Sequence, residues 1–136
     1  MDLMRTISIA ASGLKAQSGR MRVIAENIAN ADSTAATPGA DPYRRKVPTF
    51  VNSFDRELGA HTVTLGRIRP DQSDFRTRYD PAHPAANEEG VVKLPNVNSL
   101  IEQMDMREAQ RSYEANLNLV TATRRMISRT IEILRA

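Results

Sequence analysis

The apolar residues follow two different rhythms along the chain. Between residues 3 and 31 they recur every seven positions, and the same spacing returns between residues 97 and 136. A seven-residue repeat places apolar side chains in a stripe along one side of an α-helix. Between these stretches the apolar residues alternate with polar ones, which is typical of β-strands. The pattern predicts an α+β chain with two long terminal α-helices and a small β-rich insertion.

The N-terminal stripe ends in an unusual way. Its main row contains Ile7, Leu14, Met21 and Ile28, and a companion row includes Ile24. Where a helix usually stops at a glycine, the segment ENIANADST instead places Asn27 and Asn30 among alanines. Small residues in the middle of the stretch would let another helix approach closely. We therefore expect a packing surface that ends at the two asparagines.

The C-terminal stripe repeats the arrangement. Its main row contains Met106, Tyr113, Val120, Ile127 and Leu134, with Leu117 and Ile131 beside it. Ser99 and Glu102 have the spacing of a capping box, with Asn96 and Asn98 as further capping candidates, so the helix is expected to begin near residue 97. Polar residues such as Asn116 interrupt the stripe. We expect the two helices to pair as a coiled-coil-like hairpin, and neighbouring molecules to complete the burial.

The insertion reads as a set of short strands separated by proline- and glycine-rich turns. The candidate strands are, in order, YRRKVPTFV (43–51), HTVTLGRIR (61–69), DFRTRY (74–79) and VVKL (91–94). All three phenylalanines and two of the three tyrosines fall in this region, so we expect an aromatic core there. The domains expected are a helical domain of residues 1–33 and 97–136, a linker of residues 34–42 and a small β domain of residues 43–96.

Composition narrows the class of protein. The 136 residues contain 4% aromatic residues and no tryptophan, which favours thin helix seams over a thick core. The net charge of +3 is not concentrated in a basic tail, and the absence of cysteine excludes disulfides. No apolar run approaches the roughly 18 residues of a membrane-spanning helix, and the first residues lack the pattern of a cleaved secretory signal. We expect no direct membrane insertion.

Two small clusters are candidates for chemistry. Asp80 and His83 lie close enough to share a metal, but a third ligand is not in view, so a rigid proline-rich turn is the preferred interpretation. Arg44, Arg45 and Lys46 form a basic run that would suit either phosphate groups or a salt-bridged surface. No nucleophile elbow, phosphate-binding glycine loop or zinc-binding helix is present.

These observations predict no enzyme activity, no catalytic residue, no cofactor and no metal. They leave three kinds of function open: an assembling structural subunit, a nucleic-acid-binding helical adaptor that uses the basic run, and a cytoplasmic coiled-coil regulator. The thin helix stripes favour assembly, and no nucleic-acid partner is expected.

Four segments together resemble a known family. They are SGLKAQSGRMRVIAENIANADST (12–34), DPYRRK (41–46), YDPAHPAANEEGVVKLPNVN (79–98) and MREAQRSYEANLNLVTA (106–122). In sequence and spacing they resemble bacterial flagellar axial proteins, in particular basal-body rod proteins of the FlgC type, which form the proximal rod. The longer linker between Asp32 and Tyr43 fits this type of subunit.

The resemblance implies a helical inner domain built from both termini, a small outer β domain, and export through the flagellar type III apparatus without a cleaved signal peptide. It also implies assembly in the periplasmic rod with copies of the chain and other rod proteins, and with the adaptor that links the rod to the membrane ring. Torque would then pass through packed helices. The residues expected to pack between subunits are Ile7, Leu14, Met21, Ile24, Asn27, Ile28, Asn30, Met106, Tyr113, Asn116, Leu117, Val120, Ile127, Ile131 and Leu134.

Overall fold

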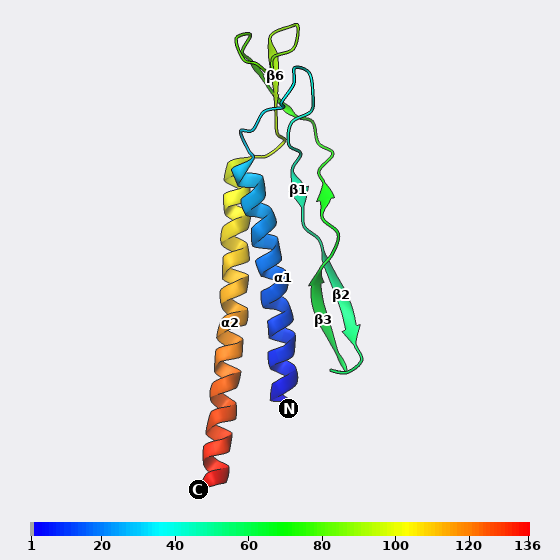
Figure 1. Cartoon of the computed structure of the whole chain (residues 1–136). Helices are drawn as coiled ribbons and strands as arrows, with labels where there is room; N and C mark the ends of the chain where they lie inside the picture. The colour runs from blue at the N-terminus through cyan, green and yellow to red at the C-terminus, as the bar shows by residue number, and fades with distance from the viewer. Residues whose placement is uncertain (1) are drawn as a thin grey trace. The chain divides into compact units, whose positions relative to one another are not determined.

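A computed structural model describes residues 2–136 and confirms the α+β arrangement (Figure 1). Two long helices enclose six short strands in the sequence. The elements are α1 (Leu3–Ala29), β1 (Lys46–Val47), β2 (Phe50–Asp55), β3 (Ala60–Leu65), β4 (Arg69–Pro70), β5 (Arg76–Tyr79), β6 (Val91–Leu94) and α2 (Ser99–Arg135). Within the described residues, no helix combines the length and apolar character needed to cross a membrane.

The chain divides into two compact units, and each contains parts of both helices. Unit 1 consists of the described residues up to Met21 with Thr49–Gly66 and Arg107–Ala136, and unit 2 consists of Arg22–Pro48 with Arg67–Met106. Each unit therefore combines helical turns with at least one pair of strands.

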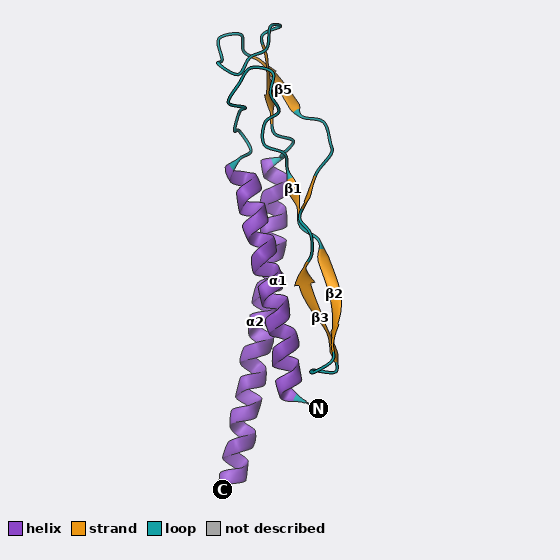
Figure 2. Cartoon of the chain, turned by 45° about the vertical axis from the view of Figure 1, so that its right-hand side comes forward, coloured by secondary structure: helices purple, strands orange, loops and turns teal. Residues whose placement is uncertain are grey.

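Within each unit, the turns of α1 and α2 that it contains lie side by side and run antiparallel (Figures 1 and 2). Three contacts define their register. Asn27 hydrogen-bonds Glu102, Arg20 pairs with Glu108, and the Cα of Gly13 lies so close to Asn116 that an added Cβ would come within 2.9 Å of its Nδ2. In each pair the two residue numbers add up to 128 or 129. The two units therefore pair the turns of α1 and α2 in the same register, as expected for regularly paired helices.

In unit 1, the β2–β3 hairpin packs against α1. The strands pair antiparallel from Phe50↔Leu65 to Asp55↔Ala60. Val63 donates its backbone N–H to the Ser12 hydroxyl, and a Cβ added to Gly19 would meet Leu65 at 2.8 Å. The hairpin thus uses the close approach that a glycine on α1 permits.

The strands are shorter than the sequence suggests because proline and glycine interrupt them. The predicted strand 43–51 is split at Pro48, which has no N–H to donate to a ladder. The predicted strand 61–69 is split at Gly66, whose N–H bonds the Thr49 carbonyl at 2.7 Å. The products form three separate two-stranded sheets in the order β1–β4, β2–β3 and β5–β6.

The core of unit 2 is aliphatic. Val92 and Leu94, on alternate positions of β6, are buried together with Ala85, and Val23 and Val97 are buried where the helices begin and end. The expected aromatic core is therefore wrong. Among the aromatic residues of the insertion, Phe50, Phe54 and Tyr79 are exposed, because the two-stranded sheets have no second layer to cover them.

Both helices begin at an acidic or amide side chain. The Asp2 carboxylate accepts the N–H groups of Met4 and Arg5 at the start of α1. At the start of α2 the Asn98 side chain accepts the N–H groups of Leu100 and Ile101. The expected capping box of Ser99 and Glu102 is wrong, because Asn98 is the cap and the Glu102 side chain turns into the protein instead.

Candidate functional site

The seam between the helices is lined by small and polar side chains. The most deeply buried row of α2 consists of Glu102, Ala109 and Thr123, and the half-buried Asn116 continues the same seven-residue spacing. Opposite them, α1 buries alanines and Gly13. Small residues let the helix axes approach closely, so the α2 side of this seam is formed without the large apolar residues of that helix, whereas α1 also buries Val23 and Ile24.

Those large apolar residues face outward instead. Of the predicted packing residues, Leu117 is 45% exposed, Ile131 50% and Leu134 80%. Other exposed apolar residues of α2 are Leu100, Ile101, Met104, Leu119, Met126 and Ile133. Scattered apolar residues are common on protein surfaces, but a series that follows one helix for most of its length is typical of an interaction surface.

The remaining predicted packing residues lie at intermediate depth or inside the chain. Ile24 and Asn27 are buried, whereas the other members of the set are half-buried. The half-buried residues are Ile7, Leu14, Met21, Ile28, Asn30, Met106, Tyr113, Asn116, Val120 and Ile127. Their partial exposure leaves part of each side chain available to a neighbour.

The buried Asn27 fastens three segments of unit 2 together. Its amide N–H groups donate to the Lys46 carbonyl at 2.8 Å and to the Glu102 carboxylate at 3.2 Å. Its amide oxygen accepts the Tyr43 hydroxyl at 2.7 Å and the Lys46 N–H at 2.9 Å. An asparagine side chain can donate two hydrogen bonds and accept two, so Asn27 uses its full capacity inside the molecule.

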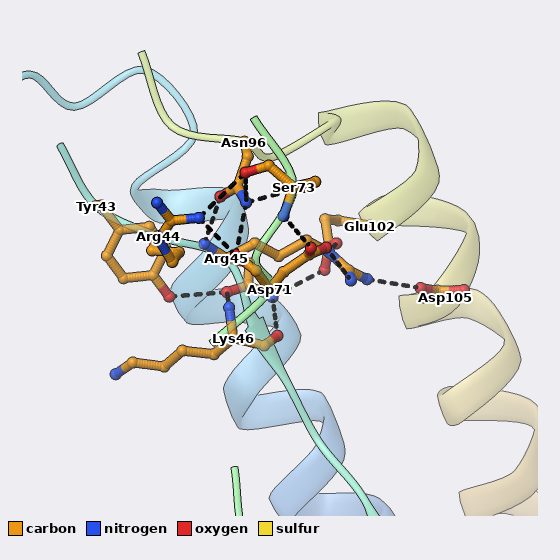
Figure 3. Close-up of polar contacts among 10 residues, drawn as sticks. Tyr43, Arg44, Arg45, Lys46, Asp71, Ser73, Asn96, Glu102 and Asp105 are labelled. Carbon is orange, nitrogen blue, oxygen red and sulfur yellow. Dashed lines mark hydrogen bonds and ion pairs between the residues drawn. The ribbon is translucent and has the colours of Figure 1, made fainter. Parts of the chain in front are cut away.

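Arg45 forms the second centre of this polar cluster (Figure 3). Its Nε donates to Glu102, which is 1% exposed, and its two terminal nitrogens lie 3.4 Å from an Asp71 carboxylate oxygen and 3.7 Å from that of Asp105. Its backbone N–H donates to Asn96 at 2.7 Å. A planar guanidinium can serve several carboxylates at once, which a lysine could not do in this geometry.

Two further side chains extend the cluster around the loop after β4. The Asn96 amide donates to the carbonyls of Asp71 and Ser73 and to the Ser73 hydroxyl. Arg44 donates to the same two carbonyls and lies 4.2 Å from the centre of the Phe75 ring. We name the set Asn27, Tyr43, Arg45, Asp71, Asn96 and Glu102 the polar node.

The polar node shifts the pKa values of three of its groups. Burial, followed by the charges of Glu26 and Glu102, raises the pKa of Tyr43 to about 12. Burial lowers the pKa of Arg45, but the hydrogen bond and charge of Glu102 outweigh burial and raise it. Hydrogen bonds from Ser73, assisted by Arg45, lower the pKa of Asp71. At neutral pH the polar node therefore contains the neutral Tyr43 phenol beside a charged Arg45 and a charged Asp71.

Asn30 has a local role that differs from that of Asn27. Its amide donates to the Glu26 carbonyl at 2.9 Å, and its own carbonyl accepts the Ser33 hydroxyl. The Arg76 guanidinium then donates to the Ala31 carbonyl at 2.8 Å. These side chains satisfy carbonyls in the last turn of α1 and just beyond its end, so the helix ends without a glycine.

The basic run is held by partners within the chain. Arg45 binds carboxylates, Lys46 pairs with Glu26, and Arg44 donates to carbonyls and stacks on an aromatic ring. These cations belong to the salt-bridged surface of the second interpretation, and their geometry does not favour phosphate binding. His83 accepts the Ala85 N–H through Nδ1 and so stabilises the proline-rich turn. Residues 2–136 hold no group of three or more His, Cys, Asp or Glu side chains suited to a metal.

The sequence pattern singles out members of the polar node but does not indicate that they lie together. It predicts Asn27 as a subunit-packing residue, Glu102 as part of a capping box and Arg45 as part of a basic run on a strand. Their hydrogen bonds join residues that are 57 to 75 positions apart in the chain. The sequence offers one sign of this cluster: an amide, an acid and a base each lie within a predicted helix or strand. A polar group that is buried there needs a hydrogen-bond partner.

Comparison with known proteins places the chain in a family. Residues 7–36 match the family described as "Flagella basal body rod protein", and residues 88–133 match "Flagellar basal body rod FlgEFG protein C-terminal". The flagellar basal-body rod protein FlgC of Agrobacterium fabrum is 53% identical over 94% of this chain and 92% of its own length. Those of Bacillus subtilis and Salmonella typhimurium are 37% and 36% identical, each over 98% of this chain and over 99% and 98% of their own lengths. The chain belongs to the FlgC-type family of flagellar basal-body rod proteins, and it is a structural rod subunit.

Proposed function

We propose that the chain assembles helically with copies of itself and with other rod proteins to carry motor torque across the periplasm. The observation that carries this proposal is the series of exposed large apolar residues along α2, which includes Leu117 and Ile131. Such exposed apolar residues do not prevent the free chain from folding. Burying them against a neighbour would stabilise the assembled state. We infer that the rod-to-membrane-ring adaptor is a neighbour at the base and that the flagellar type III apparatus exports the chain without a cleaved signal.

The proposed mechanism is mechanical and includes no chemical step. The polar node would keep the end of α1, β1 and the start of α2 together under load, since Asn27 and Arg45 contact all three. The half-buried predicted packing residues would pack against helices of neighbouring subunits. We further propose that residues 1–33 and 97–136 form the inner part of the rod, that residues 43–96 form an outer part, and that residues 34–42 link them.

Substitution of Leu117 by aspartate tests the proposal. A charge at this exposed position should leave the free chain folded but should prevent a neighbour from covering the surface. In a strain that lacks the native gene, Leu117→Asp should be produced at normal levels and should abolish swimming and basal-body assembly. Asn118→Asp adds the same charge at the adjacent exposed position and serves as the control, which should retain swimming. Normal swimming by Leu117→Asp would contradict the proposal.

A further inference from the structure

The last turns of α2 continue beyond the end of α1. The constant register of the seam places Leu3, the first residue of α1, opposite residue 126. Residues 127–135 therefore have no counterpart on α1, which leaves about 14 Å of helix uncovered at about 1.5 Å per residue. Ile131, Ile133 and Leu134 are accordingly at least half exposed. We call residues 124–136 the α2 tail.

The α2 tail combines this apolar surface with a strong positive charge. It contains four arginines and one glutamate, and none of the four arginines has an ion pair among the described residues of this chain. The arginines are Arg124, Arg125, Arg129 and Arg135. A helix end of this kind suits a partner surface that offers carboxylates together with apolar contacts.

The loops of unit 2 have the complementary composition. Segments 32–41 and 80–90 together contain five acidic residues and no lysine or arginine. They lie against each other, since Ala35 and Gly39 line the same small cavity as Ala85 and Asn87. We call them the acidic loops. Their acidic residues are Asp32, Asp41, Asp80, Glu88 and Glu89, of which Glu88 and Glu89 have no ion pair within the described chain.

The acidic loops also expose apolar groups beside these carboxylates. Pro81 and Pro84 are exposed, and the neighbouring Tyr79 is 74% exposed. An aromatic ring and rigid proline rings can cover isoleucine and leucine side chains without a large loss of conformational entropy. Both the charge and the apolar surface of the acidic loops thus match those of the α2 tail.

We propose that the α2 tail of one copy binds the acidic loops of a second copy. This inference rests on the proposed function and specifies one of its contacts. The two surfaces differ, so the contact is heterologous and leaves one α2 tail and one set of acidic loops free at the ends of each pair. Such a contact adds further copies instead of closing a dimer, which is the geometry that a helical assembly requires.

Disulfide cross-linking in assembled basal bodies tests this contact. The chain contains no cysteine, so every disulfide must join introduced residues. A strain that produces both Arg129→Cys and Glu88→Cys chains should yield a covalent dimer on mild oxidation, while either variant alone should yield none. The control replaces Glu88→Cys by Glu57→Cys, an exposed residue in the β2–β3 turn, and should give no dimer. Three further loop positions, Asp32, Asp41 and Glu89, are tested in the same way.

The outcomes separate this inference from the proposed function. If the chain is present in purified basal bodies but none of the four loop positions cross-links to residue 129, the contact is overturned and the proposed function stands. A cross-link from residue 129 to a different rod protein alone also overturns the contact. If the chain is absent from basal bodies, both the contact and the proposed function fail.

Charge reversal gives a second and independent readout. Arg125→Glu with Arg129→Glu should lower the number of assembled rods about tenfold, and Glu88→Arg with Glu89→Arg should do the same, because like charges would face each other. A chain that carries all four substitutions should recover assembly, since the reversed charges again attract. Failure of the fourfold variant to recover, with its helix content unchanged by circular dichroism, would overturn the contact.

Discussion

The two ends of α2 differ in where their side chains find partners. At the first turns, Glu102 is 1% exposed and binds Arg45 and Asn27 within the same chain. At the last turns, Leu134 is 80% exposed and lies beyond the turns of α2 that pair with α1. One helix therefore begins in a polar cluster that is complete within the chain and ends in an apolar surface that is not. The comparison separates residues that stabilise the subunit from residues that join subunits.

This separation follows from the type of residue at each place. A buried carboxylate must be neutralised and hydrogen-bonded inside the chain, because no neighbour could be relied on to do so before assembly. An exposed isoleucine or leucine has no such requirement and can remain in contact with water until a neighbour covers it. Substitutions in the polar node should therefore change the free energy of unfolding, and substitutions on the outer face of α2 should change assembly.

The largest effect on stability is expected for Glu102→Ala. The substitution removes the carboxylate that Arg45 and Asn27 both bind, and breaking a buried ion pair should lower the free energy of unfolding by about 3 kcal/mol. Urea denaturation followed by circular dichroism measures the change. Glu108→Ala is the matched control on the same helix: its side chain is 69% exposed and pairs with Arg20 at 3.6 Å, so the loss should stay below about 1 kcal/mol. Equal losses of unfolding free energy for Glu102→Ala and Glu108→Ala would contradict the view that the polar node stabilises the subunit.

Of the two asparagines at the end of α1, Asn27 should contribute more to the free energy of unfolding than Asn30. Asn27→Ala leaves the part-buried Lys46 carbonyl and the Tyr43 hydroxyl without their partner, and should lower the free energy of unfolding by about 2 kcal/mol. Asn30→Ala removes one bond to the Glu26 carbonyl and should cost about 0.5 kcal/mol. The same denaturation experiment compares them. A larger loss for Asn30→Ala would show that Asn27 does not fasten unit 2.

The effect expected at Tyr43 is smaller than that at Asn27, and it depends on pH. Its pKa is raised from 10.0 to about 12 in the folded chain, so the folded state holds the phenolic proton more tightly than the unfolded state. This contribution to stability is complete below pH 10 and is lost as the pH rises through about 12. Near neutral pH, Tyr43→Phe should cost about 1 kcal/mol through the lost hydrogen bond to Asn27.

An alkaline titration isolates this tyrosine. Subtraction of the tyrosinate absorbance of Tyr43→Phe from that of the unsubstituted chain leaves the signal of Tyr43 alone, with helix content recorded at each pH. The difference should have its midpoint near 12. A midpoint at 10.0, the ordinary value for tyrosine, would show that the phenol lies outside the polar node.

The long helices and their pairing were predictable because seven-residue spacing is a local and repeated signal. The same spacing did not reveal which row faces the other helix. Leu117 and Ile131 are more hydrophobic than Ala109 and Thr123, yet the smaller pair is buried, because close approach of two helices favours small residues. Hydrophobicity thus indicated the surface that neighbours are proposed to cover. It did not indicate the row of α2 residues that faces α1.

The polar node was not predictable for a different reason. The side chains of Asn27, Arg45 and Glu102 come from three segments, and their contacts form only when the whole of unit 2 has folded. The strand limits were also set by the fold: Pro48 and Gly66 interrupt strands that alternation alone would have continued.

Thiol labelling of Leu117→Cys shows whether a neighbour covers the exposed apolar residues of α2 in the rod, since the chain contains no other thiol. We expect rapid reaction with a maleimide in the free, folded subunit and strong protection in purified basal bodies, because a neighbour covers this outward position on α2. Asn118→Cys, one residue further along the helix, reports the reactivity of an adjacent exposed site in the same two samples. Equal labelling of Leu117→Cys in the free subunit and in the rod would contradict the claim.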